Sequence, residues 1–233
     1  YGNNNDYYND YDDNNPFSSF YDDSDNLETF EKELSPLFEP SNNKYKPDFQ
    51  TDSIYENNAI EDDTHVYFVS YTNRAENGYR YDYLYRMNKD TKAIEIVVDA
   101  RDLGGIYTFD LTDDSVVFSI LGDEYETRTY MATYYKVAKS GGNAEQIFNA
   151  MSGAFSIYEG YVYLLNSGDA RLIKIGYDND QNIKFDEYVF DVVGYDDIVT
   201  SRRVSIVDDL FTLRVFNKAN QRESFYQYDI NSL

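Results

Sequence analysis

An acidic tight turn followed by an apolar, strand-like run recurs four times along the chain. The runs begin near His65, Val116, Tyr161 and Leu210, so successive runs start 51, 45 and 49 residues apart. Each run is preceded by one short strand-like stretch and followed by one or two more. A period of about 40–50 residues with four strands per unit is typical of β-propeller blades. The sequence therefore predicts an all-β fold of about four propeller-type blades of antiparallel strands.

The later strands of each unit fit the same period. Third strands are expected at Tyr83, Thr133, Arg171 and Ser224, each alternating inward and outward residues before a polar turn. Fourth strands are expected at Ala93, Ala144 and Asp186. The fourth unit has none before Leu233, so we expect the last blade to be incomplete.

Alternation also predicts the core. Residues two apart on a strand share one face, so equivalent second-strand positions are expected to be buried against a neighbouring sheet. The predicted core positions are Val66, Phe68, Val116, Phe118, Val162, Leu164 and Phe211. The connecting turns, rich in Asp, Asn and Gly, are expected to be structural connectors because these residues tolerate left-handed backbone.

Two strings resemble a known family. YLYRMNKDTKAIEIVVD, from Tyr83, and TYYKVAKSGGNAEQIFN, from Thr133, resemble the blades of a bacterial domain family of unknown function, described as low-density-lipoprotein-receptor-like β-propeller. The acidic turns followed by VYF or VYLLN are similar to that family too. The resemblance covers about Ile54–Leu233. It departs where MNKDT replaces a glycine turn and where the third unit has the longer turn IGYDNDQN.

The resemblance implies a location but no activity. Members look like extracytoplasmic parts of bacterial envelope proteins, often behind a membrane anchor and a polar linker. An extracytoplasmic, secreted or cell-surface location is therefore expected. The family carries no catalytic signature to transfer.

The first fifty residues differ from the rest. Residues 1–50 form an acidic tail or stalk rich in Asn, Asp and Tyr, with too few apolar residues to repay the entropy of ordering, and residues 51–233 form the repeat domain. Leu27, Phe30 and Leu34 have helical spacing, which favours a short docking helix ending before Pro36. The sequence starts at Tyr1 and not at Met, for which the loss of a signal or anchor is one explanation.

Charge and composition exclude several functions. The chain has 43 acidic residues against 20 Lys and Arg, and its net charge of −23 disfavours nucleic acid and anionic membranes. It has no Cys, so thiol chemistry and disulfides are excluded. No apolar run approaches about 18 residues, so no membrane insertion is expected. The 26 Tyr residues favour half-buried strand faces over platforms for sugar rings.

Catalytic residues are not identified by any motif. His65 is the single histidine, it begins a strand, and no G-x-S-x-G motif accompanies it. Asp110 and Glu159 are candidates for a glycosidase pair, but acids are too abundant for such a pair to be specific. We predict no catalytic residue and no cofactor.

One acidic turn is compared with a calcium loop. Asp178, Asp180 and Asn182 match the first three ligand positions of an EF-hand. Ile183 replaces the required Gly, and Val189 replaces the bidentate Glu, so the motif fails. Weak cation binding at Asp178, Asp180 and Asn182 remains a hypothesis, as does a looser cluster in the tail at Asp22, Asp23 and Asp25.

The sequence favours a non-catalytic extracytoplasmic module that binds or scaffolds a protein or carbohydrate ligand. A carbohydrate-binding or glycoside-processing propeller domain and a structural subunit of a surface assembly are the alternatives.

The incomplete last blade leaves an open strand edge at 225–230, an aggregation hazard. Pairing of this edge with residues 48–54 would close a ring. Pairing with residues 1–40 of another chain would indicate an assembly, and an unpaired edge would indicate a fragment. A truncated or partner-completed repeat, with self-association through this edge, is favoured over a closed four-bladed ring.

Overall fold

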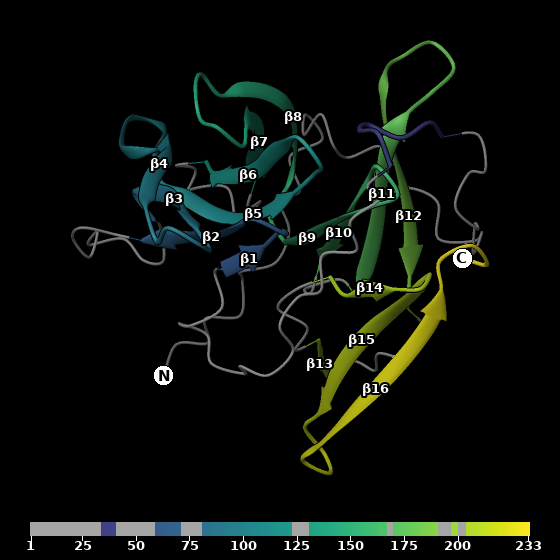
Figure 1. The fold of residues 1–233 in the computed structure, drawn as a ribbon. Helices are drawn as coiled ribbons and strands as arrows, with labels where there is room; N and C mark the ends of the chain where they lie inside the picture. The colour runs from purple at the N-terminus through teal and green to yellow at the C-terminus, as the bar shows by residue number, and fades with distance from the viewer. Residues whose placement is uncertain are drawn as a thin grey trace, which may run out of the picture.

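The chain folds into antiparallel β-sheets (Figure 1). The computed structural model describes residues 34–40, 59–70, 81–122, 131–166, 170–190, 197–199 and 204–233. These residues form four sheets and contain no α-helix, only the 3₁₀ turn η2 (Arg101–Leu103). The predicted all-β class is confirmed.

The first three sheets are meanders in which each strand pairs with the next along the chain. Their strands begin close to the predicted positions, except that β12 starts at Ile183, earlier than the predicted Asp186. The first sheet holds β1 (Ala59–Glu61), β2 (His65–Ser70), β3 (Tyr83–Asn88) and β4 (Ile94–Asp99). The second holds β5 (Ile106–Leu111), β6 (Ser115–Leu121), β7 (Met131–Ala138) and β8 (Glu145–Met151). The third holds β9 (Ala154–Tyr158), β10 (Tyr161–Asn166), β11 (Arg171–Tyr177) and β12 (Ile183–Val189).

The fourth sheet is built differently. It holds β13 (Asp197–Val199), β14 (Ile206–Val207), β15 (Leu210–Asn217) and β16 (Arg222–Asp229). The short strands β13 and β14 pair with opposite ends of β15, and β16 pairs along its full length. Two short strands therefore stand beside β15 where each of the other sheets has a single first strand. On its outer edge β16 pairs with no strand among the described residues, and residues 48–54 lie outside them.

The turns between first and second strands act as connectors, as predicted. In the third sheet Glu159 and Gly160 have φ of 48° and 78°, and in the fourth Asp208 and Asp209 have φ of 50° and 65°. Positive φ at both central residues is what a type I′ hairpin turn requires. Asp tolerates this conformation, which explains the acidic pair Asp208–Asp209 in the fourth sheet.

Three hydrophobic cores lie between consecutive sheets. Successive strand residues point to opposite faces, so the middle sheets contribute to two cores each. In β6, Val116 and Phe118 pack toward the first sheet, whereas Val117 packs toward the third. In β10, Leu164 packs toward the second sheet and Tyr163 toward the fourth. Among the described residues, no core cluster joins the first sheet to the fourth.

The predicted core is correct for the three later sheets and wrong for the first. Val116, Phe118, Val162, Leu164 and Phe211 are all fully buried. Val66 and Phe68 are only half-buried, and Tyr67 between them is 1% exposed instead. The reason is that Tyr67 faces the second sheet, whereas no described sheet covers the face that carries Val66 and Phe68.

Part of the tail lies against the third sheet. Ser35 makes an antiparallel bridge to Tyr177, with two backbone hydrogen bonds of 2.8 Å, and the backbone N–H of Phe38 donates to the carbonyl of Gly160 at 3.0 Å. Leu34 is buried. The end of the predicted helix, at Leu34 and Ser35, is therefore extended, and its residues 27–33 lie outside the described residues. A Cβ on Gly160 would lie 2.0 Å from the Phe38 carbonyl oxygen, so this position requires glycine.

Two substitutions of phenylalanine by alanine test whether hydrophobic cores lie only between consecutive sheets. Phe118→Ala is expected to lower the free energy of unfolding by about 3–5 kcal/mol, because a fully buried ring is lost from between two sheets. Phe68→Ala, at the equivalent position of the first sheet, is expected to cost only about 1–2 kcal/mol because its ring is half-buried. Urea denaturation measures both. Equal losses would show that the first sheet is covered as completely as the second.

Candidate functional site

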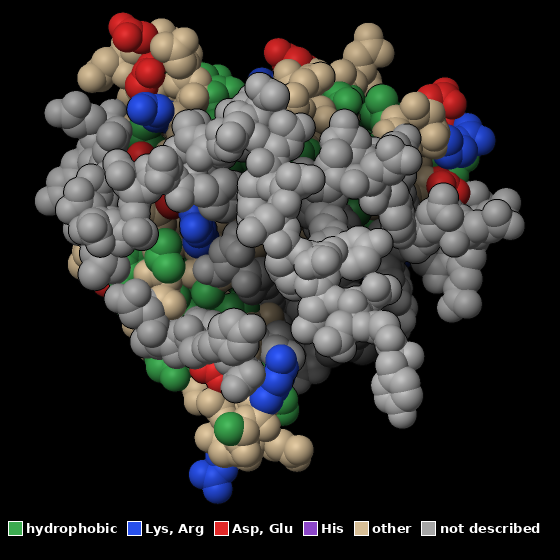
Figure 2. Space-filling view, turned by 180° about the vertical axis from the view of Figure 1, so that it is seen from behind, with side chains coloured by type: hydrophobic (Ala, Val, Ile, Leu, Met, Phe, Trp, Pro, Cys, Tyr) green, Lys and Arg blue, Asp and Glu red, His purple; other side chains and the backbone are tan. Residues whose placement is uncertain are grey.

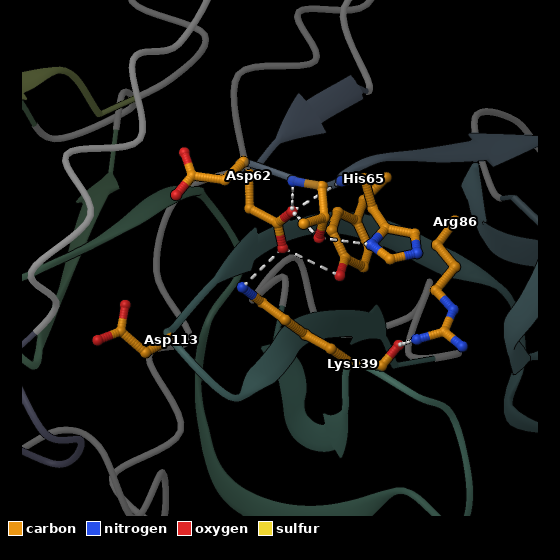
Figure 3. A pocket seen from close by; sticks show the side chains of 8 residues that line it. Asp62, His65, Arg86, Asp113 and Lys139 are labelled. Carbon is orange, nitrogen blue, oxygen red and sulfur yellow. Dashed lines mark hydrogen bonds and ion pairs between the residues drawn. The ribbon is translucent and has the colours of Figure 1, made fainter. Parts of the chain in front are cut away.

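A polar pocket of about 380 Å³ opens where the first and second sheets meet (Figure 3). It is formed by the turn before β2, the turn before β6, the middle of β3 and the turn after β7. Its lining residues are Asp62, Asp63, Thr64, His65, Tyr67, Arg86, Asp113 and Lys139. Acids, cations, a hydroxyl and the single histidine thus lie within one site.

Asp62 organises the turn at the floor of the pocket. Its Oδ1 accepts hydrogen bonds from the backbone N–H of Thr64 at 2.9 Å and of His65 at 2.8 Å, and from the Thr64 hydroxyl at 3.1 Å. An Asp side chain that bonds the following amides stabilises a turn without glycine. The carboxylate therefore has a structural role within its own hairpin.

The other oxygen of Asp62 joins the two sheets. Lys139, from the second sheet, lies 3.1 Å from Oδ2, and the Tyr67 hydroxyl donates to Oδ2 at 3.2 Å. The side chains of Lys139 and Asp62 are only 14% and 11% exposed. Burial opposes ionisation of Asp62, but the amides of Thr64 and His65 together with Lys139 outweigh it and hold the pKa far below its usual value.

Arg86 is also engaged in bonds to the protein. Its Nη1 donates to the carbonyl of Lys139 at 3.1 Å, and its Nε donates to Glu95 at 2.8 Å. Figure 3 shows the Arg86 guanidinium beside the Lys139 carbonyl and the Lys139 ammonium pointing toward Asp62, whereas Asp113 lies apart from this network. Both cations of the pocket are therefore used to hold the two sheets together.

His65 lies beside the Thr64 hydroxyl in the same turn. Its Nδ1 is 2.8 Å from that hydroxyl, which also contacts Asp62 Oδ1 at 3.1 Å. The tautomer of His65 decides which of the two side chains donates in the Nδ1 contact. The half-buried histidine at the start of β2 is thus bonded within its own turn.

Asp110 joins the second sheet to the third. It is 8% exposed, and its Oδ2 accepts hydrogen bonds from the Ser156 hydroxyl at 2.9 Å and the Ile157 amide at 2.7 Å, both on β9. Glu159, the other acid of the proposed glycosidase pair, lies in the turn after β9. The carboxylate of Asp110 is therefore committed to packing β5 against β9.

Asp209 joins the third sheet to the fourth. The Tyr158 hydroxyl donates to its carboxylate at 2.9 Å and accepts from its backbone N–H at 3.1 Å. Burial and the hydrogen bond to Asp209 raise the pKa of Tyr158. Sequence reasoning missed all three inter-sheet acids, because nothing local to Asp62, Asp110 or Asp209 shows which sheet is their neighbour.

The proposed cation-binding residues are brought together in the turn between β11 and β12. Asp178 Oδ1 accepts hydrogen bonds from the amides of Asp180 at 2.9 Å and Asn182 at 2.8 Å. The bond from the Asn182 amide is the main reason that the pKa of Asp178 is lowered. Cation binding here stays a prediction. No cluster of three or more metal-ligating side chains is found in the described part of the chain.

On the face of the molecule shown in Figure 2, the Lys and Arg side chains of the described residues lie apart from one another and do not gather into one patch. No helix in the described ranges has the length and hydropathy needed to cross a membrane.

No protein-family model matches this chain, and no curated protein matches it. The likeness to the bacterial propeller family therefore rests on the quoted strings alone.

Asp62→Asn tests the inter-sheet ion pair through the pH dependence of stability. A carboxylate whose pKa is lowered on folding stabilises the native state above its unfolded pKa of about 3.9, and this stabilisation is lost as the pH falls further. At pH 7 the substitution is expected to lower the free energy of unfolding by about 1–3 kcal/mol. Urea denaturation between pH 7 and pH 2 should show the difference from wild type shrinking below about pH 4.

Asp63→Asn is the matched control, because Asp63 is the exposed neighbour of Asp62 in the same turn. It is expected to change the free energy of unfolding by less than about 0.5 kcal/mol at every pH. A pH-independent loss in Asp62→Asn, or an equal loss in the control, would contradict the structural role of Asp62.

Chelation tests the β11–β12 turn. EDTA is expected to leave the melting temperature unchanged, and added calcium is not expected to raise it, because backbone and side-chain N–H groups already bond the Asp178 carboxylate. Differential scanning calorimetry measures both. A melting temperature that falls by many degrees, returns with calcium and no longer responds in Asp180→Asn would establish a metal site.

Proposed function

We propose that this chain is a non-catalytic, extracytoplasmic binding or scaffolding module of a bacterial cell envelope, built from propeller-type blades. The arrangement of the sheets supports the architecture. Four four-stranded antiparallel sheets follow one another, with β1, β5, β9 and β14 toward the middle and β4, β8, β12 and β16 at the periphery (Figure 1). Blades of a propeller have this radial order of strands.

The proposal rests mainly on one observation: the charged side chains at the centre of the pocket already bond other groups of the protein. Asp62, Lys139 and Arg86 bond one another or the backbone and thereby join two sheets. A catalytic pair needs an acid or base directed at a substrate position. Asp62 and Lys139 are directed at each other and Arg86 at a backbone carbonyl, which favours a rigid scaffold over a reaction centre.

The extracytoplasmic location rests on the sequence. The likeness to envelope proteins, the absence of Cys and the net charge of −23 are all compatible with a surface protein. On such a body the turns and loops at the sheet ends are the surfaces that vary most freely, so they are the proposed contacts for a protein or carbohydrate ligand.

A structural subunit of a surface assembly is the second candidate. It is favoured by the outer edge of β16, which pairs with no strand among the described residues. An exposed edge is a template for a strand from another chain. Self-association through this edge is therefore part of the proposal.

Turnover of chromogenic glycosides distinguishes a scaffold from a glycosidase. The purified chain is expected to release no chromophore from a panel of α- and β-linked nitrophenyl sugars. A measurable rate that Glu159→Gln abolishes without lowering the melting temperature would contradict the non-catalytic proposal. Glu159 is the suitable position because it is a turn residue, whereas Asp110 also holds two sheets together.

A further inference from the structure

The short tail segment 34–38 is bonded to the third sheet through its backbone, beside β11 (Figure 1). Ser35 exchanges two backbone hydrogen bonds of 2.8 Å with Tyr177, at the end of β11 that extends past its pairing with β10. The N–H of Phe38 donates to the carbonyl of Gly160 at 3.0 Å. A peptide that is added to the edge of a sheet is held by main-chain bonds of this kind.

Side chains of the segment and of the sheet strengthen this contact. The Tyr161 hydroxyl donates to the carbonyl of Leu34 at 2.6 Å, and Leu34 is 6% exposed. Leu37 and Phe38 pack against the core between the second and third sheets. The segment therefore contributes apolar side chains as well as backbone groups, as a peptide ligand does.

Two glycines make room for the segment. A Cβ on Gly160 would lie 2.0 Å from the Phe38 carbonyl oxygen, and a Cβ on Gly176 would lie 2.6 Å from the Ser35 carbonyl oxygen. Gly160 also has the φ of 78° that its turn requires, whereas Gly176 lies within β11 and is not among the residues of positive φ. A glycine inside a strand often marks the close approach of another backbone, and here that backbone is the tail.

These contacts define a site and its ligand. We call Gly160, Tyr161, Gly176 and Tyr177 the tail-docking site. The ligand that fits it is an extended peptide with apolar side chains at the positions of Leu34, Leu37 and Phe38. The Ser35 side chain is exposed, so at that position the site contacts the backbone alone.

The covalent connection does not confine the segment to its own sheet. Residues 41–58 join it to β1, and a chain of this length reaches about 60 Å when it is fully extended. Every copy of the protein carries the same segment and the same site. Exchange of an identical element between copies needs no new interface, because the contacts in the exchanged state are those already formed within one chain.

We infer that the tail-docking site binds segment 34–38 of a second copy as well as that of its own chain, so that copies associate by exchanging tails. This contact is distinct from the outer edge of β16. The inference is independent of the proposed binding function, because it uses neither the pocket nor the loops at the sheet ends.

Docking within one chain is expected to predominate in dilute solution. A tethered segment has an effective concentration of the order of millimolar at its own site, and a second copy must compete with it. Exchange is therefore favoured where copies are concentrated or where a chain's own segment is released. Variants that release the segment or block the site separate these two states.

Peptide binding to the full chain tests the site. The probe is a fluorescent peptide of residues 34–40, LSPLFEP, and its anisotropy is measured. Ser35→Pro removes the N–H that donates to Tyr177, so the chain's own segment is weakened. This variant is expected to bind the peptide at least about tenfold more tightly than wild type, whose site is already occupied.

Four further variants serve as controls and alternatives. Ser35→Ala keeps the backbone N–H and changes an exposed side chain, so it is expected to behave as wild type. Leu34→Asp, which would bury a charge, is a second way to release the segment. Gly176→Ala in the Ser35→Pro chain is expected to abolish binding. If Gly176→Ala fails to fold, Tyr161→Phe, which removes only the donor to Leu34, is expected to weaken binding several-fold.

A mixture of two variants tests exchange between copies. Ser35→Pro offers a free site, and Gly176→Ala offers a released segment. Sedimentation velocity at about 0.5 M salt, which screens the net charge of −23, is expected to show a one-to-one complex in the mixture that neither variant forms alone. Association through the β16 edge would occur in each variant alone, so the comparison separates the two contacts.

Three results would overturn the inference. If the peptide does not bind the folded Ser35→Pro and Leu34→Asp chains, the site holds this segment only within its own chain. If the peptide binds but the mixed variants form no complex, copies do not exchange tails. Peptide binding that persists in the chain with Gly176→Ala would place the ligand elsewhere on the protein.

Discussion

The structure depends on strands that bury both of their faces. In the middle sheets one strand supplies alternate side chains to two cores, as Val116 and Val117 of β6 do. This arrangement explains why β6 is apolar almost without interruption, whereas β16 of the last sheet alternates. Each sheet is stabilised by its neighbours, so stability accumulates along the series as it does in other repeat proteins.

Polar groups fix the sheets relative to one another at each interface. Asp62 binds Lys139 between the first two sheets, Asp110 binds β9 across the next interface, and Asp209 binds Tyr158 across the last. Apolar packing alone is not directional, whereas a buried carboxylate with fixed donors requires one geometry. Several acids of this very acidic chain therefore have a structural role. Asp62 in the pocket is one of them, because it bonds a residue of the neighbouring sheet.

Cross-strand charges follow the same repeat. Arg86 pairs with Glu95 and Lys136 with Glu145, in each case between the third and fourth strands of a sheet. The equivalent third-strand position on β16 is Gln227, and within the described ranges no strand pairs with β16 on its outer side.

The sequence predicted correctly those features that depend on residues close together in the chain. Period-two alternation and turn residues placed the second strands at His65 and Tyr161, because a hairpin is determined by residues close together in the chain. It failed where the outcome depends on distant segments. Phe68 was expected in the core, but its burial requires a further sheet, and the docking of Ser35 on Tyr177 joins residues far apart in sequence. The roles of Asp62 and Asp110 were missed for the same reason.

Residue-resolved native-state hydrogen exchange tests the serial packing of the sheets most directly. If each sheet is stabilised only by its neighbours, amides of β6 and β10 will exchange only through global unfolding. Amides of β2 and β15, in the terminal sheets, will then exchange through smaller openings of lower free energy. Equal protection in all four strands would contradict this account, because it would mean that the first and fourth sheets are held as firmly as the middle two.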